Sequence, residues 1–337
     1  MAKKLYYMVV DTETATLPFA NEIAGNDPER KKRIAIAKPL VYDIGWTICD
    51  RQGNIYDKKQ FLIAETFSVP SVFNTAYYAN KRPLYINMLD NGEITIKPWR
   101  EVMQIFIADL NKVNAVGAFN AMFDFKKAIP FTELYINELY SADYYDWEKR
   151  QRFLCKRIAD GLDKNRESEG FEADIFRFHG NEYALFDIWG LATTHLLNNA
   201  TYKTACIDHG LFTSSGTFFK TSAESSYKYL RNKYDFEESH TALDDAIIES
   251  FILSKVAMRH AVTIGIKFFP FRDLGYTDEY CRRRKVPNMG ECEAVYNAIA
   301  AYIDAKIANG EDTNYMRGLI KRLKTLAEYA GIDCKYE

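Results

Sequence analysis

The chain has 337 residues, of which 47% are hydrophobic and 27% are charged, and its formal net charge is −2 at pH 7. This length allows two domains, or one domain with large insertions, around a substantial core. The near-neutral charge argues against a protein that holds nucleic acid by bulk charge, but it does not exclude one that holds a chain end through metal ions.

Cysteine usage and hydropathy point to an ordinary intracellular protein. The 6 cysteines are scattered and include no C-x-x-C pair, so we predict neither a zinc site nor a disulfide framework. The first apolar stretch is interrupted by Asp11 and is too short for the core of a signal peptide, and no apolar run is long enough to span a bilayer. We therefore expect a cytoplasmic protein with no membrane partner. Two basic runs, at 30–33 and 282–285, are either solvated surface or phosphate contacts.

The first elements are predicted to form an antiparallel meander. Residues 5–10 are apolar or aromatic and suit a strand that is covered on both faces. An irregular polar segment follows at 18–38, which we interpret as an insertion. Strands are then predicted at 40–50 and 55–64, joined by a turn in which Gly53 takes a positive φ.

Helices and strands alternate along the rest of the chain. The predicted elements are a helix at 96–112 with Pro98 in its first turn, a strand at 113–118 that turns helical near Asn120, an insertion at 131–183 with a solvated loop at 160–170, a strand-to-helix junction at Asp187, and a helix at 239–261. Two further helices, at 291–310 and 313–332, suggest a C-terminal helical hairpin. We thus predict one domain at 1–286 and a hairpin extension at 287–337.

Asp11 and Glu13 stand one residue apart where the first predicted strand ends. In an extended chain, residues two apart point to the same side, so the two carboxylates would face one spot. Like charges held that close raise each other's pKa unless a cation lies between them. The alternative is a strand that ends in a turn capped by Asp11 or Thr12. This pair alone leaves both interpretations open.

Two more acidic motifs favour a shared metal site. "FNAMFD" at 119–124 and "HTALDD" at 240–245 also lie at junctions between apolar elements, where the sites of open α/β sheets form. Carboxylates gathered there would need cations, and oxygen ligands favour Mg²⁺ or Mn²⁺ over zinc. Each residue alone could be a surface acid, a cap or a bystander, but the three motifs together favour convergence. The predicted members are Asp11, Glu13, Asp124, one of Asp244 and Asp245, and His240 as a base.

"VVDTET", "FNAMFD" and "HTALDDA" resemble the three motifs of the DnaQ-like, or DEDDh, 3′→5′ exonucleases. The resemblance covers roughly residues 5–261 without the insertions, and it implies an RNase H-like fold, a mixed sheet that begins with an antiparallel meander. It also implies that Asp11 bridges two Mg²⁺ or Mn²⁺ ions while His240 acts as the general base. Glu13 and Asp245 would complete the shell of one ion, and Asp124 would act largely through water. Helical spacing from His240 alone would favour Asp244; we choose Asp245 because the family's histidine precedes the helix.

The expected function is therefore a two-metal 3′→5′ exonuclease that releases nucleoside monophosphates from a single-stranded 3′ end, with DNA favoured. Thr12, Thr14, Phe119 and Asn120 are expected near the terminal nucleotide. The motifs do not separate DNA from RNA, so an exoribonuclease is one alternative. A non-catalytic nucleic-acid-binding or polymerase-associated module, with a replication or repair protein as partner, is another. A structural protein with capping acids is a third. "TATLP" after Glu13 replaces the family's Gly-containing turn, so the terminal-nucleotide pocket is expected to differ.

Overall fold

The computed structural model describes residues 5–30, 39–140, 147–164, 175–213, 218–256, 292–309 and single residues between 316 and 336. Internal contacts separate the chain into two units. One combines Met1–Ile188 with Glu238–Pro270, and the other combines Trp189–Glu237 with Phe271–Glu337. The predicted boundary at 286/287 lies outside the described residues and stays a prediction. The grouping of 189–237 with the C-terminal residues was not expected.

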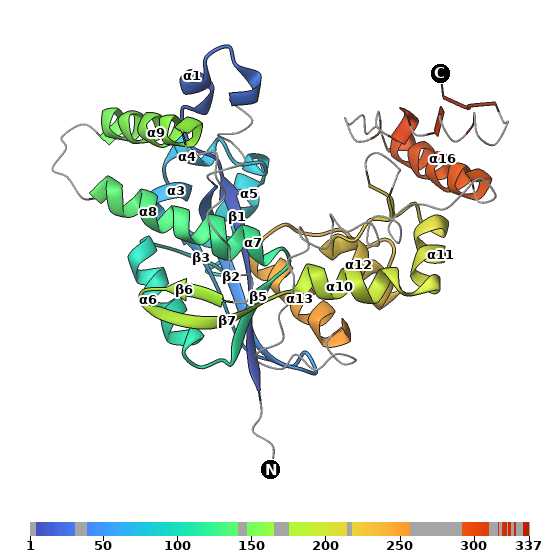
Figure 1. Cartoon of the computed structure of the whole chain (residues 1–337), viewed down its shortest axis with the longest axis horizontal. Helices are drawn as coiled ribbons and strands as arrows, with labels where there is room; N and C mark the ends of the chain where they lie inside the picture. Colours follow the sequence, from blue (N-terminus) through green and yellow to red (C-terminus); the bar gives the residue numbers. More distant parts are fainter. Residues whose placement is uncertain are drawn as a thin grey trace. The chain divides into compact units, whose positions relative to one another are not determined.

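The first unit is built on a seven-stranded mixed sheet in the order β4-β3-β2-β1-β5-β7-β6 (Figure 1). Strands β1, β2 and β3 form the predicted antiparallel meander, whereas β5 is parallel to β1 and β7 is parallel to β5. The helices flank this sheet, as predicted, and the arrangement is consistent with an RNase H-like α/β fold. The strands are β1 (Tyr6–Ala15), β2 (Leu40–Asp50), β3 (Ile55–Ile63), β4 (Thr95–Lys97), β5 (Ala115–Ala118), β6 (Ile175–Phe178) and β7 (Asn181–Asp187).

Strand β1 does not end at Asp11, contrary to the sequence-based prediction. It continues through Glu13 to Ala15 because β2 is long enough to pair with it along its whole length, as far as Ala15 opposite Leu40. The parallel pairing of β1 with β5, by contrast, reaches only Val9. Asp11 and Glu13 therefore lie just beyond the point where β5 stops covering that edge of β1. The two carboxylates still lie where neighbouring strands separate. The separation occurs because the pairing of β1 with β5 ends, and not because β1 itself ends.

Strand β2 lies inside the sheet, between β3 and β1, and all 11 of its residues are buried. On one face it carries helix α13 (Ala242–Val256), where Thr47 Oγ1 lies 2.6 Å from Ser250 Oγ. On the other face Trp46 contacts helix α6 (Trp99–Leu110) and donates from Nε1 to Asp109 at 2.9 Å. Helices cover both faces of β2, which explains why most of its residues are apolar.

The segments interpreted as insertions contribute helices to this unit. Helix α8 (Ile129–Tyr140) buries Phe131 and Tyr135 against the core, and α9 (Trp147–Lys164) includes residues 160–164, which were predicted to be loop. Residues 165–170 of that loop lie outside the described residues. The remaining short helices are α1 (Ala20–Ala24), α3 (Ala64–Phe67), α4 (Pro70–Phe73), η1 (Ala79–Lys81), α5 (Arg82–Asp90), α7 (Ala121–Phe123) and the π-helical turn η2 (Asp124–Ala128).

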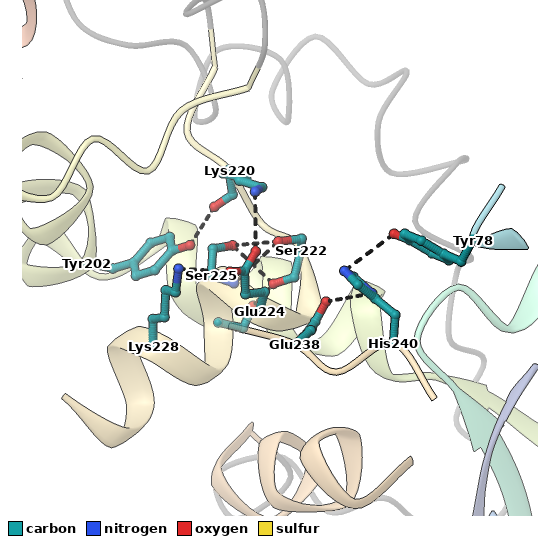
Figure 2. A network of polar contacts seen from close by, with 10 residues as sticks. Tyr78, Tyr202, Lys220, Ser222, Glu224, Ser225, Lys228, Glu238 and His240 are labelled. Carbon is teal, nitrogen blue, oxygen red and sulfur yellow. Dashed lines mark hydrogen bonds and ion pairs between the residues drawn. The ribbon is translucent and has the colours of Figure 1, made fainter. Parts of the chain in front are cut away.

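The second unit is helical. Helix α10 (Ile188–Leu197) leads into it from β7, and α11 (Ala200–Asp208) contacts α16 (Cys292–Ala308), the first helix of the predicted hairpin. Helix α12 (Ala223–Arg231) is capped by Ser222, whose hydroxyl accepts a hydrogen bond from Ser225 N at 3.3 Å; Figure 2 shows this cap. The second hairpin helix is described only at single positions, of which Met316, Leu319, Leu323 and Ala327 are helical and buried. Within the described parts of the chain, no helix has the length and apolar character needed to cross a bilayer.

Candidate active site

An acidic cluster gathers in the first unit, beside the start of α13. Asp11 and Glu13 come from β1, and Asp124 opens the turn η2 after β5. Asp245 lies in the first turn of α13 and Glu249 one turn later. The charges of the other four carboxylates all act on Asp11, which shows that the five groups share one electrostatic site. The acids predicted from three distant motifs are thus brought together.

Glu13, His240 and Asp245 form the tightest part of this cluster. One ligand atom from each lies within 4.8 Å of the other two, a spacing that could hold a metal ion. Asp11 and Asp124 are outside this triplet. Asp124 nevertheless adds to the raised pKa of Glu13, and Glu13 and Asp245 add to the raised pKa of Asp11. The donor set of carboxylates with one imidazole suits divalent ions such as Mn²⁺, and the carboxylates alone suit Mg²⁺.

His240 is held between an aromatic ring and two carboxylates. Its ring stacks on Tyr78 with centroids 4.4 Å apart, and its Nε2 lies 3.4 Å from the Tyr78 hydroxyl. Nδ1 lies 3.7 Å from Glu238 and 3.8 Å from Asp245; Figure 2 shows His240 between Tyr78 and Glu238. The backbone of His240 is left-handed, with φ 51°, and α13 begins two residues later. This loop position matches the expectation that helical spacing does not govern His240.

The two neighbouring aspartates of the third motif face different surroundings. Asp245 is 8% exposed and points to His240, whereas Asp244 is exposed and accepts hydrogen bonds from the hydroxyls of Ser239 and Thr241 at 2.8 and 2.9 Å. Asp244 thus stabilises the start of the helix, where its charge favours the N-terminal dipole. The geometry therefore brings Asp245, and not Asp244, into the acidic cluster.

Two of the four residues expected near the terminal nucleotide donate hydrogen bonds to acids of the cluster. Thr12 is buried, and its hydroxyl donates to Asp124 Oδ1 at 2.6 Å. The backbone N–H of Phe119 donates to Glu249 at 3.1 Å, and Asn120 takes a left-handed conformation, with φ 77°, directly before α7. Thr14 pairs with Val41 just after a register shift in β1. Contact of these residues with a nucleotide stays a prediction.

Burial and neighbouring carboxylates raise the pKa of four acids of the cluster. Burial is the main cause that raises the pKa of Asp11 well above its usual range, of Glu13 to about 9 and of Asp124 to about 7. The pKa of Glu249 is raised strongly for the same reason, with Asp124 and Asp245 adding to the effect. Lys81 is a neighbouring cation at the edge of these buried acids. Divalent ions bound among the acids would reduce the repulsion between their carboxylates and favour the ionised forms.

Sequence reasoning missed Glu249 and Asp43. Glu249 looks like a surface acid of an amphipathic helix, yet it is 2% exposed and faces the cluster because α13 is buried almost all round. Asp43 is an acid in the interior of a fully buried strand, and that pattern was a usable signal. Its carboxylate accepts from Ala242 N, Gln60 Nε2 and Tyr85 Oη at 2.8–3.0 Å.

Small residues let α13 lie directly on β2. A Cβ atom on Gly45 would stand 2.3 Å from Leu243 N, so only glycine permits this approach. Together with the Asp43 hydrogen bond, this contact fixes the start of α13 and therefore the position of Asp245.

The basic runs that could contact phosphate lie outside the described residues except for Arg30, which bonds locally to Asp27 and Ile23.

Comparison of the chain with known protein families, with curated proteins and with solved structures finds no match. The acidic cluster and the sequence motifs that build it are therefore the features that point to a function.

Proposed function

We propose that the protein is a metal-dependent 3′→5′ exonuclease that hydrolyses the last phosphodiester bond of a nucleic-acid strand. One observation carries the proposal: Asp11, Glu13, Asp124 and Asp245 converge from three distant segments beside an imidazole. A structural protein has no need to bury several acids of one charge around a histidine, because each costs free energy to desolvate.

The donor set fits two divalent ions. Asp11, Glu13, Asp124 and Asp245 would hold them, and Mg²⁺ or Mn²⁺ suits carboxylate oxygens. When bound, such a pair supplies charge stabilisation for the attacking and leaving oxygens of a phosphodiester. Thr12 orients Asp124 for this task through its hydroxyl, and Asp43 orients Asp245 by anchoring the first turn of α13.

His240 is the proton acceptor in this proposal. Its ring is 31% exposed, so water can reach it, and stacking on Tyr78 fixes its orientation. The ring nitrogen that faces the acids, Nδ1, lies beside Asp245 and Glu238, whose negative charges would stabilise the imidazolium formed when a proton is taken from the attacking water.

A polarity assay tests the proposal. The protein is incubated with single-stranded and duplex DNA and RNA, labelled at the 5′ end, in Mn²⁺, Mg²⁺ or EDTA. The proposal predicts a metal-dependent ladder that shortens from the 3′ end, lost in Asp11→Asn and retained in Asp244→Asn, the matched acid outside the cluster. Endonucleolytic fragments, or equal activity in EDTA, would contradict it.

The same labelled strands separate the alternatives when binding and thermal stability are also measured. Shortening of RNA but not of DNA would make the protein an exoribonuclease. Binding of the strands, measured by anisotropy, without shortening in either metal would favour a non-catalytic module. A protein that neither binds the strands nor melts at a higher temperature with Mn²⁺ or Mg²⁺ would be a structural protein.

A further inference from the structure

An exposed aromatic ring stands beside the histidine of the acidic cluster. Tyr77 is 87% exposed, the highest exposure among the large hydrophobic side chains of the described residues. Its ring meets the ring of Tyr78 edge-on, with centroids 4.8 Å apart. Tyr78 in turn stacks on His240 at 4.4 Å. Two ring contacts therefore connect an exposed flat surface to the proposed proton acceptor.

The segment that carries Tyr77 is anchored on both sides. Before it, Ala76 is buried, and the Thr75 hydroxyl both accepts from Thr16 N and donates to Thr16 O, at 3.0 and 2.9 Å. After it, Lys81 donates to the carbonyl oxygen of Ser239, the residue before His240, and its Nζ lies 4.7 Å above the Tyr78 ring. Tyr77 is thus held in place by its neighbours while its own ring stays open to solvent.

The low net charge of the chain explains why an aromatic contact would be needed near the site. The formal net charge is −2, so the chain as a whole does not attract a phosphate backbone. Bulk attraction for a nucleic-acid backbone is therefore weak. Stacking of a base on an aromatic ring supplies affinity without charge and tolerates any base, because every base has a π-face.

We propose that Tyr77 is a stacking platform for an unpaired nucleobase close to the 3′ end. Stacked nucleotides rise about 3.4 Å each, so a ring two contacts away from His240 reaches a base within the first few nucleotides of the scissile bond. Because a base inside a duplex already stacks on its neighbours, the platform selects single-stranded or frayed ends as the substrate class. This inference rests on the proposed exonuclease function for the direction in which the strand lies.

An abasic scan tests the platform. The probe is a 5′-fluorescein-labelled single strand of DNA, either intact or with one abasic nucleotide at each of the last four positions. Binding is measured by anisotropy in Ca²⁺, and shortening is measured in Mn²⁺. The variants are Tyr77→Ala, Tyr77→Phe and Phe153→Ala. Phe153 is the matched control because it is a 68% exposed ring on α9. Thermal melts check that each variant is folded.

We expect Tyr77→Ala to weaken binding of the intact strand by a factor of about 5 to 150, while Tyr77→Phe and Phe153→Ala stay within about twofold of the wild type. One abasic position should weaken wild-type binding by a similar factor and have no further effect on Tyr77→Ala, because the two changes remove the same contact. A blunt duplex should be insensitive to Tyr77→Ala.

The inference would be overturned if Tyr77→Ala bound the intact strand as tightly as the wild type does. It would also be overturned if an abasic position weakened binding equally in the wild type and in Tyr77→Ala, or if Tyr77→Ala lost as much affinity for the blunt duplex as for the single strand. Strands that shorten independently of Tyr77 would refute the platform and leave the exonuclease intact. Tyr77-dependent binding without shortening would refute the exonuclease and leave the platform intact. Neither binding nor shortening would refute both.

Discussion

The Asp43 carboxylate accepts a hydrogen bond from the backbone N–H of Ala242 at 3.0 Å, which ties the buried strand β2 to the first turn of α13. Asp43 is fully buried and also accepts from Gln60 and Tyr85. One side chain in the sheet therefore sets where the helix that carries Asp245 begins, and it also keeps His240, two residues before Ala242, close to the acids of β1.

Replacing Asp43 should destabilise the protein and loosen the site together. Asp43→Ala leaves three buried donors without their acceptor, which should lower the free energy of unfolding by about 2–4 kcal/mol and weaken Mn²⁺ binding. Denaturant unfolding and Mn²⁺ titration measure the two effects. The control, Asp90→Ala at an exposed position of α5, should change neither. Full Mn²⁺ affinity in a folded Asp43→Ala protein would contradict the anchoring role.

Gly45→Ala tests the close approach of α13 to β2. The added Cβ meets backbone atoms of Leu243, which cannot rotate away, so α13 must shift at a cost of about 1–3 kcal/mol. Gly92→Ala has open space around it but a left-handed backbone, with φ 71°, and should cost about 1–2 kcal/mol through strain alone. The two variants are thus comparable in stability, but only Gly45→Ala should lose catalytic activity. Equal activities would show that the position of α13 does not matter.

His240→Asn separates a base from a metal ligand. Asparagine tolerates the left-handed backbone of His240, so the variant should fold. If His240 is the general base, kcat should fall by about 10²–10⁴ while Mn²⁺ affinity is retained. The matched control is His179→Asn, another left-handed histidine that lies beside Glu133. Loss of Mn²⁺ binding in His240→Asn would instead make the imidazole a ligand, as its place in the triplet with Glu13 and Asp245 allows.

The stability of the metal-free protein should fall as pH rises. The folded-state pKa values of Glu13 and Asp124, about 9 and about 7, are raised above their ordinary values by burial. Each group therefore contributes stability that is full below its unfolded pKa and is lost as pH rises through the folded value. Thermal melts in EDTA between about pH 5 and pH 9 should show this decline, and a smaller one in Glu13→Gln. Saturating Mn²⁺ should add most stability at high pH, where fewer protons must be displaced. An EDTA melting profile that does not change in Glu13→Gln would refute this electrostatic account.

The sequence was sufficient for the parts of the structure that depend on local pattern. Apolar runs located β1, β2 and β3, and three motifs at element junctions selected Asp11, Glu13, Asp124, His240 and one of Asp244 and Asp245. The family resemblance chose Asp245, and the fold brings these residues together. The end of β1 was wrong because strand length is set by the pairing partner, β2, and not by the apolar run itself.

Residues that act through tertiary packing could not be found in this way. Glu249 joins the cluster only because α13 is buried on nearly every side, and Tyr78 reaches His240 across 162 positions of sequence. The segment 74–81 has neither periodicity nor a motif, so nothing local marks it as a neighbour of the acids. Asp43 is the exception, since an acid inside an apolar strand is itself a signal of a specific buried partner.

Equilibrium Mn²⁺ binding tests the central claim, that acids from three segments form one divalent-cation site. Calorimetric titration of the wild-type protein should show two Mn²⁺ ions per chain. Asp11→Asn and Asp245→Asn should each abolish or strongly weaken this binding, while Asp244→Asn, one residue away but outside the cluster, should leave it unchanged. No binding to the wild type, or equal affinity in all four proteins, would contradict the account.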